Sequence, residues 1–65
     1  MIKVVIRFEN DMGVVFDKNG EQIPEYQGQY EAVKEGILKD ATPGVVFAHG
    51  FADSGELQKV SREEW

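Results

Sequence analysis

The residues of this chain that most suggest chemistry are His49, Asp53 and Ser54, which lie close together in the sequence. A histidine titrates near neutral pH, and with a carboxylate and a hydroxyl it supplies the residue types of a nucleophilic site. His49 with Asp53 or Glu56 also supplies metal-ligand types, although zinc sites without cysteine usually use more than one imidazole. No motif fixes the geometry, so we expect a structural histidine, no catalytic residue, no metal and no cofactor. A small hydrolase or metal enzyme built on His49 stays open as a third hypothesis.

Glycine-containing segments give no stronger signal for a ligand. Asp17, Asn19 and Gly20 resemble the start of a calcium-binding loop, but the glycine comes two positions too early and Gly28 stands where the closing glutamate belongs. Later glycines have neither the spacing of a dinucleotide fingerprint nor the Lys-Ser/Thr ending of a phosphate loop. We interpret these glycines as turn or bulge residues.

Composition restricts the classes of partner. The 65 residues include 12 Asp and Glu against 7 Lys and Arg, a formal net charge of −5, and the basic residues are scattered. Direct binding of nucleic acid is disfavoured, because it requires clustered Lys and Arg. No apolar run is long enough to span a membrane, the start of the chain has a strand pattern instead of a signal peptide, and cysteine is absent. We therefore expect a cytoplasmic protein without membrane contact.

Two kinds of hydrophobic period predict the strands and the helix that position these residues. Alternation over 2–8 predicts a strand, and turn residues followed by 13–17 predict its hairpin partner. Asn19-Gly20 predicts a further turn, with a short extra strand at 21–23. Between 27 and 41 the apolar residues recur every three to four positions, as in an amphipathic helix that Pro43 and Gly44 terminate.

The rest of the chain returns to strand patterns. Residues 44–51 and 56–60 predict two strands around a turn at 52–55. Ser61 and Glu64 match a capping box, so we expect one C-terminal helical turn that folds Trp65 back on the domain.

The sequence thus predicts a single α+β domain over residues 1–65 of type ββαββ, an antiparallel sheet of about four strands with one helix across one face. The strand order stays open. The phase of the first strand places a set of larger apolar residues under the helix, together with one side of the third strand: Ile2, Val4, Ile6, Phe8, Val14, Phe16, Tyr30, Val33, Ile37 and Leu38.

The opposite face of the sheet is then the candidate interface. Its predicted members are small apolar strand residues with aromatic contact candidates: Val5, Val15, Val46, Ala48, Phe51 and Trp65. A contiguous apolar patch marks an interface, and a chain this short has a thin core that association would extend. We expect a non-enzymatic interaction module that self-associates or binds a protein through a sheet face or edge. The alternative is an acidic mimic of nucleic acid that inhibits a nucleic-acid-binding protein.

Overall fold

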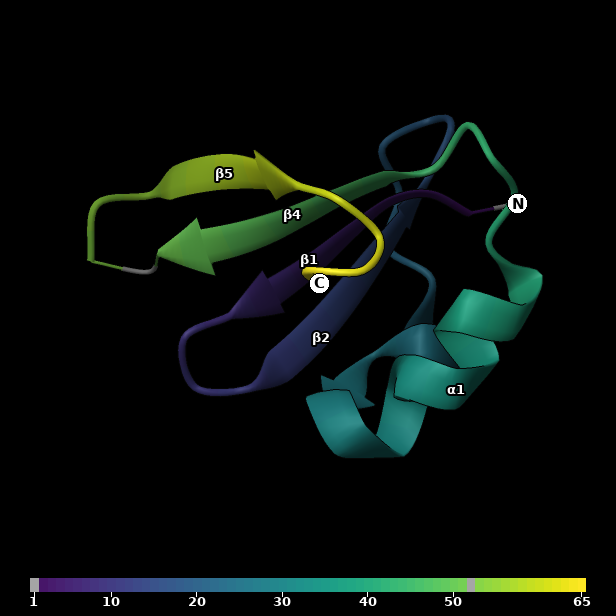
Figure 1. The fold of residues 1–65 in the computed structure, drawn as a ribbon, viewed down its shortest axis with the longest axis horizontal. Coiled ribbons are helices and arrows are strands. Elements are labelled where there is room, and N and C mark those ends of the chain that lie inside the picture. The colour runs from purple at the N-terminus through teal and green to yellow at the C-terminus, as the bar shows by residue number, and fades with distance from the viewer. Residues whose placement is uncertain (1, 52) are drawn as a thin grey trace.

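The computed structural model describes residues 2–51 and 53–65, which form a mixed five-stranded sheet with one α-helix on one side (Figure 1). The broad α+β prediction and the single helix are confirmed. In chain order the elements are β1 (Ile2–Phe8), β2 (Met12–Asp17), the 3-10 turn η1 (Pro24–Tyr26), β3 (Gly28–Gln29), α1 (Tyr30–Asp40), β4 (Val46–Phe51) and β5 (Glu56–Val60).

The sheet has the order β3-β2-β1-β4-β5, and the prediction of a purely antiparallel sheet is wrong. Neighbouring strands are antiparallel except for β1 and β4, which run parallel. The two-residue strand β3 causes the difference, because it reverses the chain once more between β2 and α1. The helix then carries the chain back over the sheet, and β4 emerges beside β1 in the same direction.

Short elements account for the remaining differences. The predicted helix over 27–41 begins only at Tyr30, since Gly28 and Gln29 pair with β2. At its end the Ala41 N–H still donates to Ile37 O at 2.8 Å before Pro43 prevents continuation. The extra strand expected at 21–23 is a single bridge between Gln22 and Phe16. Of the predicted turn at 52–55, position 52 lies outside the described residues, as does position 1.

The two faces of β1 and β2 are exchanged relative to the prediction. Val5 and Val15 are completely buried beneath the helix, with Phe47 and Ile37 beside them. The pairing of β1 with β2 shifts between Ile2 and Val4, as at a β-bulge. Because of this shift Ile2 and Val5, three positions apart, both reach the core. A one-residue slip moves every following side chain to the other face, so Val4, Ile6, Phe8, Val14 and Phe16 are not under the helix.

The C-terminal segment closes the core as expected. Ser61 and Glu64 form the capping box, with Glu64 N donating to Ser61 Oγ at 3.2 Å and Ser61 N to Glu64 Oε1 at 3.2 Å. The segment is a hydrogen-bonded turn, with Trp65 N donating to Ser61 O at 3.0 Å, and not a regular helix. Trp65 folds back and is only 3% exposed, so the predicted fold-back is confirmed.

Candidate interaction surface

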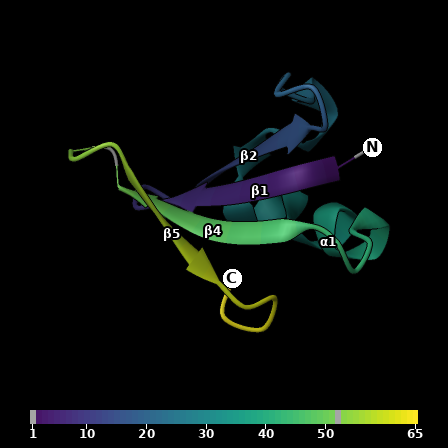
Figure 2. The same cartoon turned by 90° about the horizontal axis from the view of Figure 1, so that it is seen from above.

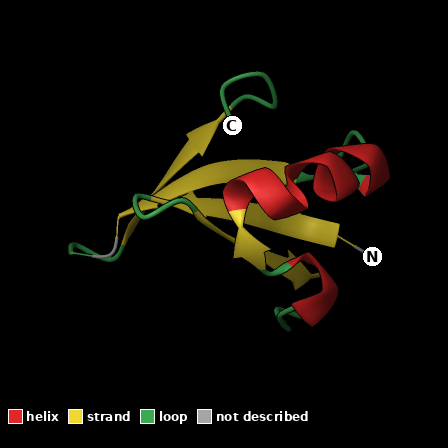
Figure 3. Ribbon diagram, turned by 90° about the horizontal axis from the view of Figure 1, so that it is seen from below, coloured by secondary structure: helices red, strands yellow, loops and turns green. Residues whose placement is uncertain are grey.

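The α-helix of the described residues covers one face of the sheet and leaves the opposite face uncovered. Figure 3 shows α1 in front of the sheet, and Figure 2, from the other side, shows the strands in front with α1 behind. We call this uncovered side the open face.

Strand register assigns the residues of the open face. Gly13 lies against Val33 of α1, so Gly13 and its partner Arg7 are on the helix side, and their neighbours along each strand point the other way. The open face therefore consists of these strand positions: Val4, Ile6 and Phe8 of β1, Met12, Val14 and Phe16 of β2, Val46, Ala48 and Gly50 of β4, and Leu57 and Lys59 of β5.

The open face is apolar and partly accessible. Ile6 and Ala48 at its centre are 5% and 3% exposed, and the surrounding valines and phenylalanines are half-buried. The Phe8 ring lies close to Gly50, where an added Cβ would come within 2.6 Å of it. At the edge, Leu57 is 57% exposed. A continuous sheet face of this kind is unusual on a protein that works alone, because isolated apolar residues are common on surfaces but large patches are not.

Charge is distributed unevenly between the faces. Lys59 stands on the edge strand β5, and the exposed Lys3 lies beside Val4 at the bulge of β1, on the open side because Ile2 and Val5 both reach the core. Glu56, which begins β5, pairs with Phe51 on the helix side. The acidic residues of the described chain lie outside these open-face strand positions, although Glu9 and Asp53 line a hollow with Phe8, Met12 and Val14 at one end of the face.

The six residues predicted for the interface do not share one surface. Val46 and Ala48 lie on the open face, as expected. Val5 and Val15 are 0% exposed in the core, so their placement on an outer surface was wrong for the register reason given above. Trp65 is buried on the helix side, and Phe51, half-buried, also points to that side.

The larger side chains of the open face were missed as surface residues. Val4-Val5-Ile6 and Val14-Val15-Phe16 are runs of three apolar residues, so either phase of alternation fits them. Arg7 and Gly13 are the residues of the sequence that could have indicated the correct phase of these strands. An arginine facing a helix requires polar partners, and a glycine in a strand often permits close approach of another element.

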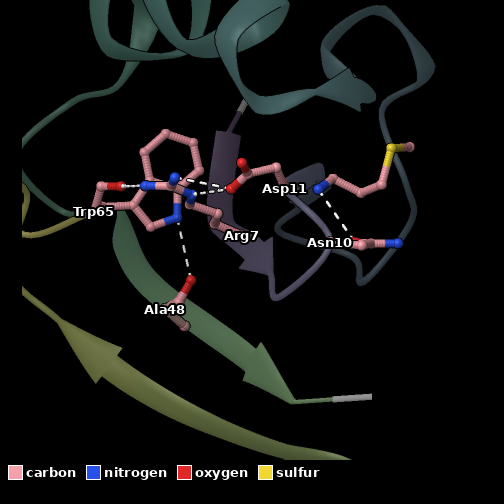
Figure 4. A network of polar contacts seen from close by, with 6 residues as sticks. Arg7, Asn10, Asp11, Ala48 and Trp65 are labelled. Carbon is pink, nitrogen blue, oxygen red and sulfur yellow. Dashed lines mark hydrogen bonds and ion pairs between the residues drawn. The ribbon is translucent and has the colours of Figure 1, made fainter.

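Those polar partners form the main polar cluster on the helix side (Figure 4). Arg7 donates from Nε and Nη2 to Asp11 Oδ1 at 3.1 and 2.8 Å, and from Nη1 to the main-chain carbonyl of Trp65 at 3.1 Å. Its guanidinium lies 3.6 Å above the Tyr30 ring centroid, and Trp65 Nε1 donates to Ala48 O at 3.1 Å. These contacts join strand, turn, helix and C-terminus, so the cluster has a structural role.

His49 is the remaining candidate for chemistry. Its register partner on β1 is Arg7 and on β5 is Gln58, so it lies on the helix side beside a shallow hollow of about 190 Å³. Its Nε2 is buried and makes no hydrogen bond with the described residues. The structure does not bring Ser54 or Asp53 into a hydrogen bond with His49: Ser54 Oγ instead accepts from Glu56 N at 3.3 Å, within the hairpin.

Other site types find no geometric support in the described ranges. Over residues 2–51 and 53–65, no three His, Asp or Glu side chains come close enough together to hold a metal ion. The helix of this part of the chain is too short and too polar to cross a membrane.

The hydroxyl of Tyr26 has a raised pKa. The exposed Tyr26 hydroxyl donates a hydrogen bond to Asp40 Oδ2, at the end of α1. This hydrogen bond and the negative charges of Asp40 and Glu25 raise the pKa of Tyr26 above its ordinary value of 10.0. The pair fastens η1 to α1 and lies away from the open face.

Comparison of the chain with protein-family models, curated proteins and solved structures gives no match.

Proposed function

We propose that this protein is a non-enzymatic interaction module that binds a protein through the open face. The observation that carries the proposal is the composition of that face: large apolar side chains over four adjacent strands, with acidic residues kept to other parts of a chain of net charge −5. The apolar centre of protein interfaces is depleted in charge in the same way, with polar groups at the rim.

The second hypothesis, an acidic mimic of nucleic acid, has less support. A mimic needs carboxylates in a row at phosphate-like intervals. Here the acids are spread over distant elements, among them Asp11 in the first turn, Glu35 on α1 and Glu63 in the C-terminal turn. Lys34 and Lys39 interrupt the acids of α1. At the open face itself, Glu9 and Asp53 line one hollow, and two carboxylates do not form the extended row that a mimic needs.

Affinity capture with open-face variants tests the proposal. Wild-type tagged protein is used to capture binding proteins, or an untagged copy of itself, from its host extract. Tagged protein carrying Val46→Lys or Phe16→Lys should no longer capture them. Both positions are half-buried, so a lysine can keep its amine in water while the backbone stays folded. Circular dichroism melting checks that each variant folds.

Glu35→Lys is the matched control, because it adds a lysine on the exposed side of α1. It should capture the same proteins as wild type. Folded open-face variants that retain every wild-type partner would overturn the proposal. If Glu35→Lys alone loses the captured proteins, and if capture by wild type weakens steeply as the salt concentration rises, the mimic would be favoured.

A further inference from the structure

We infer that a hollow between the start of β4 and the C-terminal turn binds a small carboxylic acid with an apolar body. We call it the basic hollow, and its main lining residues are Val45, Val46, Phe47, Lys59, Val60 and Arg62. The inference does not rest on the proposed function, because the ligand is a small molecule and the hollow shares only Val46 and Lys59 with the open face. Its position in the fold, its lining and its charges carry the inference.

The basic hollow forms where β4 and β5 part. Their register ends at the pair Phe47 and Val60, and Figure 2 shows β5 and the C-terminal turn leaving the line of β4. The turn follows this path because Trp65 folds back into the helix-side core. The described register therefore gives Val46 no partner on β5, and a hollow of about 340 Å³ lies there. Its volume is at the lower end of the range for small-molecule sites.

The walls of the basic hollow are largely apolar and are held by the core. Val45 and Val60 pack against the helix-side core, and Phe47 belongs to that core. Val46 and Pro43 add further apolar surface to the lining. Because the fold already orders these side chains, the hydrocarbon part of a ligand gains contact without the entropic cost of ordering the walls.

The charged residues of the lining are both cations. Lys59 and Arg62 line the basic hollow and no acidic residue of the described chain does, although the sequence has 12 acidic and 7 basic residues. Among the described residues the one ion pair is that of Arg7, so neither cation is paired with a carboxylate there. Ser61 also lines the hollow, but its hydroxyl donates to Glu64 Oε1 at 3.1 Å. The lining therefore favours an anion over a cation.

Arg62 is held in position for such a ligand. It donates from Nη2 to Leu38 O near the end of α1, and its guanidinium lies 5.9 Å from the centroid of the Phe47 ring. Its other N–H groups can donate to a carboxylate. The carboxyl end of α1 carries a partial negative charge, which disfavours a dianion such as phosphate more than a monoanion. A single carboxylate on an apolar chain therefore matches both the walls and the charges of the basic hollow.

Hexanoate is the probe of this chemistry, and an NMR titration of nitrogen-labelled protein shows where it binds. A ligand of this size should bind with a dissociation constant of about 1–10 mM. The amide signals that shift most should be those of Val45, Phe47, Val60 and Arg62. Hexan-1-ol keeps the chain without the charge, whereas acetate and inorganic phosphate keep a charge without the chain. Each of these three should bind at least roughly fivefold more weakly than hexanoate.

Charge reversal at Lys59 tests the recognition of the anion. Lys59→Glu should weaken hexanoate binding about tenfold, because a short-range attraction is replaced by a repulsion. Lys18→Glu is the matched control, since it makes the same change of charge at an exposed turn residue outside the lining of the basic hollow. It should leave the dissociation constant within about twofold of wild type. Both lysines are exposed, and circular dichroism checks that both variants fold.

Several outcomes would overturn the inference: no saturable shift, equal affinity for hexanoate and hexan-1-ol, shifts centred on Leu57 or Phe16, or unchanged binding by Lys59→Glu. The proposed function fails separately. Phe16→Lys changes the open face outside the basic hollow, so it should bind hexanoate like wild type. Hexanoate binding together with open-face variants that keep every captured protein would remove the proposed function alone. Absence of hexanoate binding together with capture that Phe16→Lys abolishes would remove only the basic hollow as a ligand site.

Discussion

At the scale of single residues, Arg7 explains why the helix side of the sheet tolerates a charge. The guanidinium is half-buried, but Asp11 accepts two of its hydrogen bonds, the Trp65 carbonyl accepts a third, and Tyr30 stacks beneath it. Because the polar requirement is met locally, the register that buries Val5 can also direct Arg7 toward the helix. The larger neighbours Ile6 and Phe8 then face the open side.

Tyr26 gives a prediction at the same scale. Its raised pKa means that the folded state favours the neutral phenol. The resulting contribution to stability is fully present below the pKa of the unfolded chain, near 10, and is lost as the pH rises through the pKa of the folded protein. Asp40→Asn keeps an acceptor but removes the main charge, and should return the pKa of Tyr26 toward 10.0.

The measurement is an absorbance titration in a Tyr30→Phe background, where Tyr26 is the only tyrosine. Glu35→Gln, which removes a carboxylate elsewhere on α1, should leave the titration unchanged. If Asp40→Asn titrates at the same pH as its parent, the Asp40 hydrogen bond and charge do not cause the shift.

At the scale of elements, the sequence was sufficient to predict a helix or strand wherever its hydrophobic residues follow a single unambiguous period. The amphipathic stretch ending before Pro43 predicted α1, and alternation with turn residues predicted the strands at 2–8 and 56–60. It was insufficient where three consecutive apolar residues fit both phases, since a bulge near Lys3 decides which face of β1 is inside. The two-residue strand β3 carries no periodic signal, yet it determines that β4 runs parallel to β1.

For the candidate site, the sequence indicated an apolar sheet face opposite the helix and placed Val46 and Ala48 on it. It assigned the wrong residues of β1 and β2 to that face, because the same phase error applies to both paired strands. The pairing of Val5 with Val15 means that correcting one strand corrects the other.

Gly50 and Gly36 form a matched pair for an element-scale prediction. Gly50→Ala should lower the free energy of unfolding by about 1–3 kcal/mol, because the new methyl group would lie 2.6 Å from the Phe8 ring and 3.0 Å from Ile6 Cγ2. Gly36→Ala, in α1 with open space around the added atom, should raise it by about 1 kcal/mol through helix propensity. Urea denaturation measures both, and a Gly50→Ala protein as stable as wild type would contradict the close packing of Phe8 over β4.

At the scale of the whole molecule, the C-terminal turn completes the helix-side core. Trp65 packs edge-on against Tyr30 of α1 and Phe47 of β4, with ring centroids 5.2 and 5.4 Å away. Its indole N–H bonds to Ala48 O, and its carbonyl accepts from Arg7. Residues from both ends of the chain therefore meet in one layer, while the open face remains free of this closure.

This closure predicts a large effect of Trp65 on global stability. Trp65→Ala should lower the free energy of unfolding by about 3–5 kcal/mol, the cost of deleting a buried aromatic side chain, against a total of about 5–15 kcal/mol for a folded domain. Trp65→Phe keeps a ring between Tyr30 and Phe47 but loses the hydrogen bond to Ala48 O, so its effect should be smaller.

The exposed Glu63, in the same turn, provides the control, since Glu63→Ala should stay within about 0.5 kcal/mol of wild type. Urea unfolding followed by circular dichroism gives all three values, and equal stability of Trp65→Ala and Glu63→Ala would mean that the core closes without the C-terminal turn.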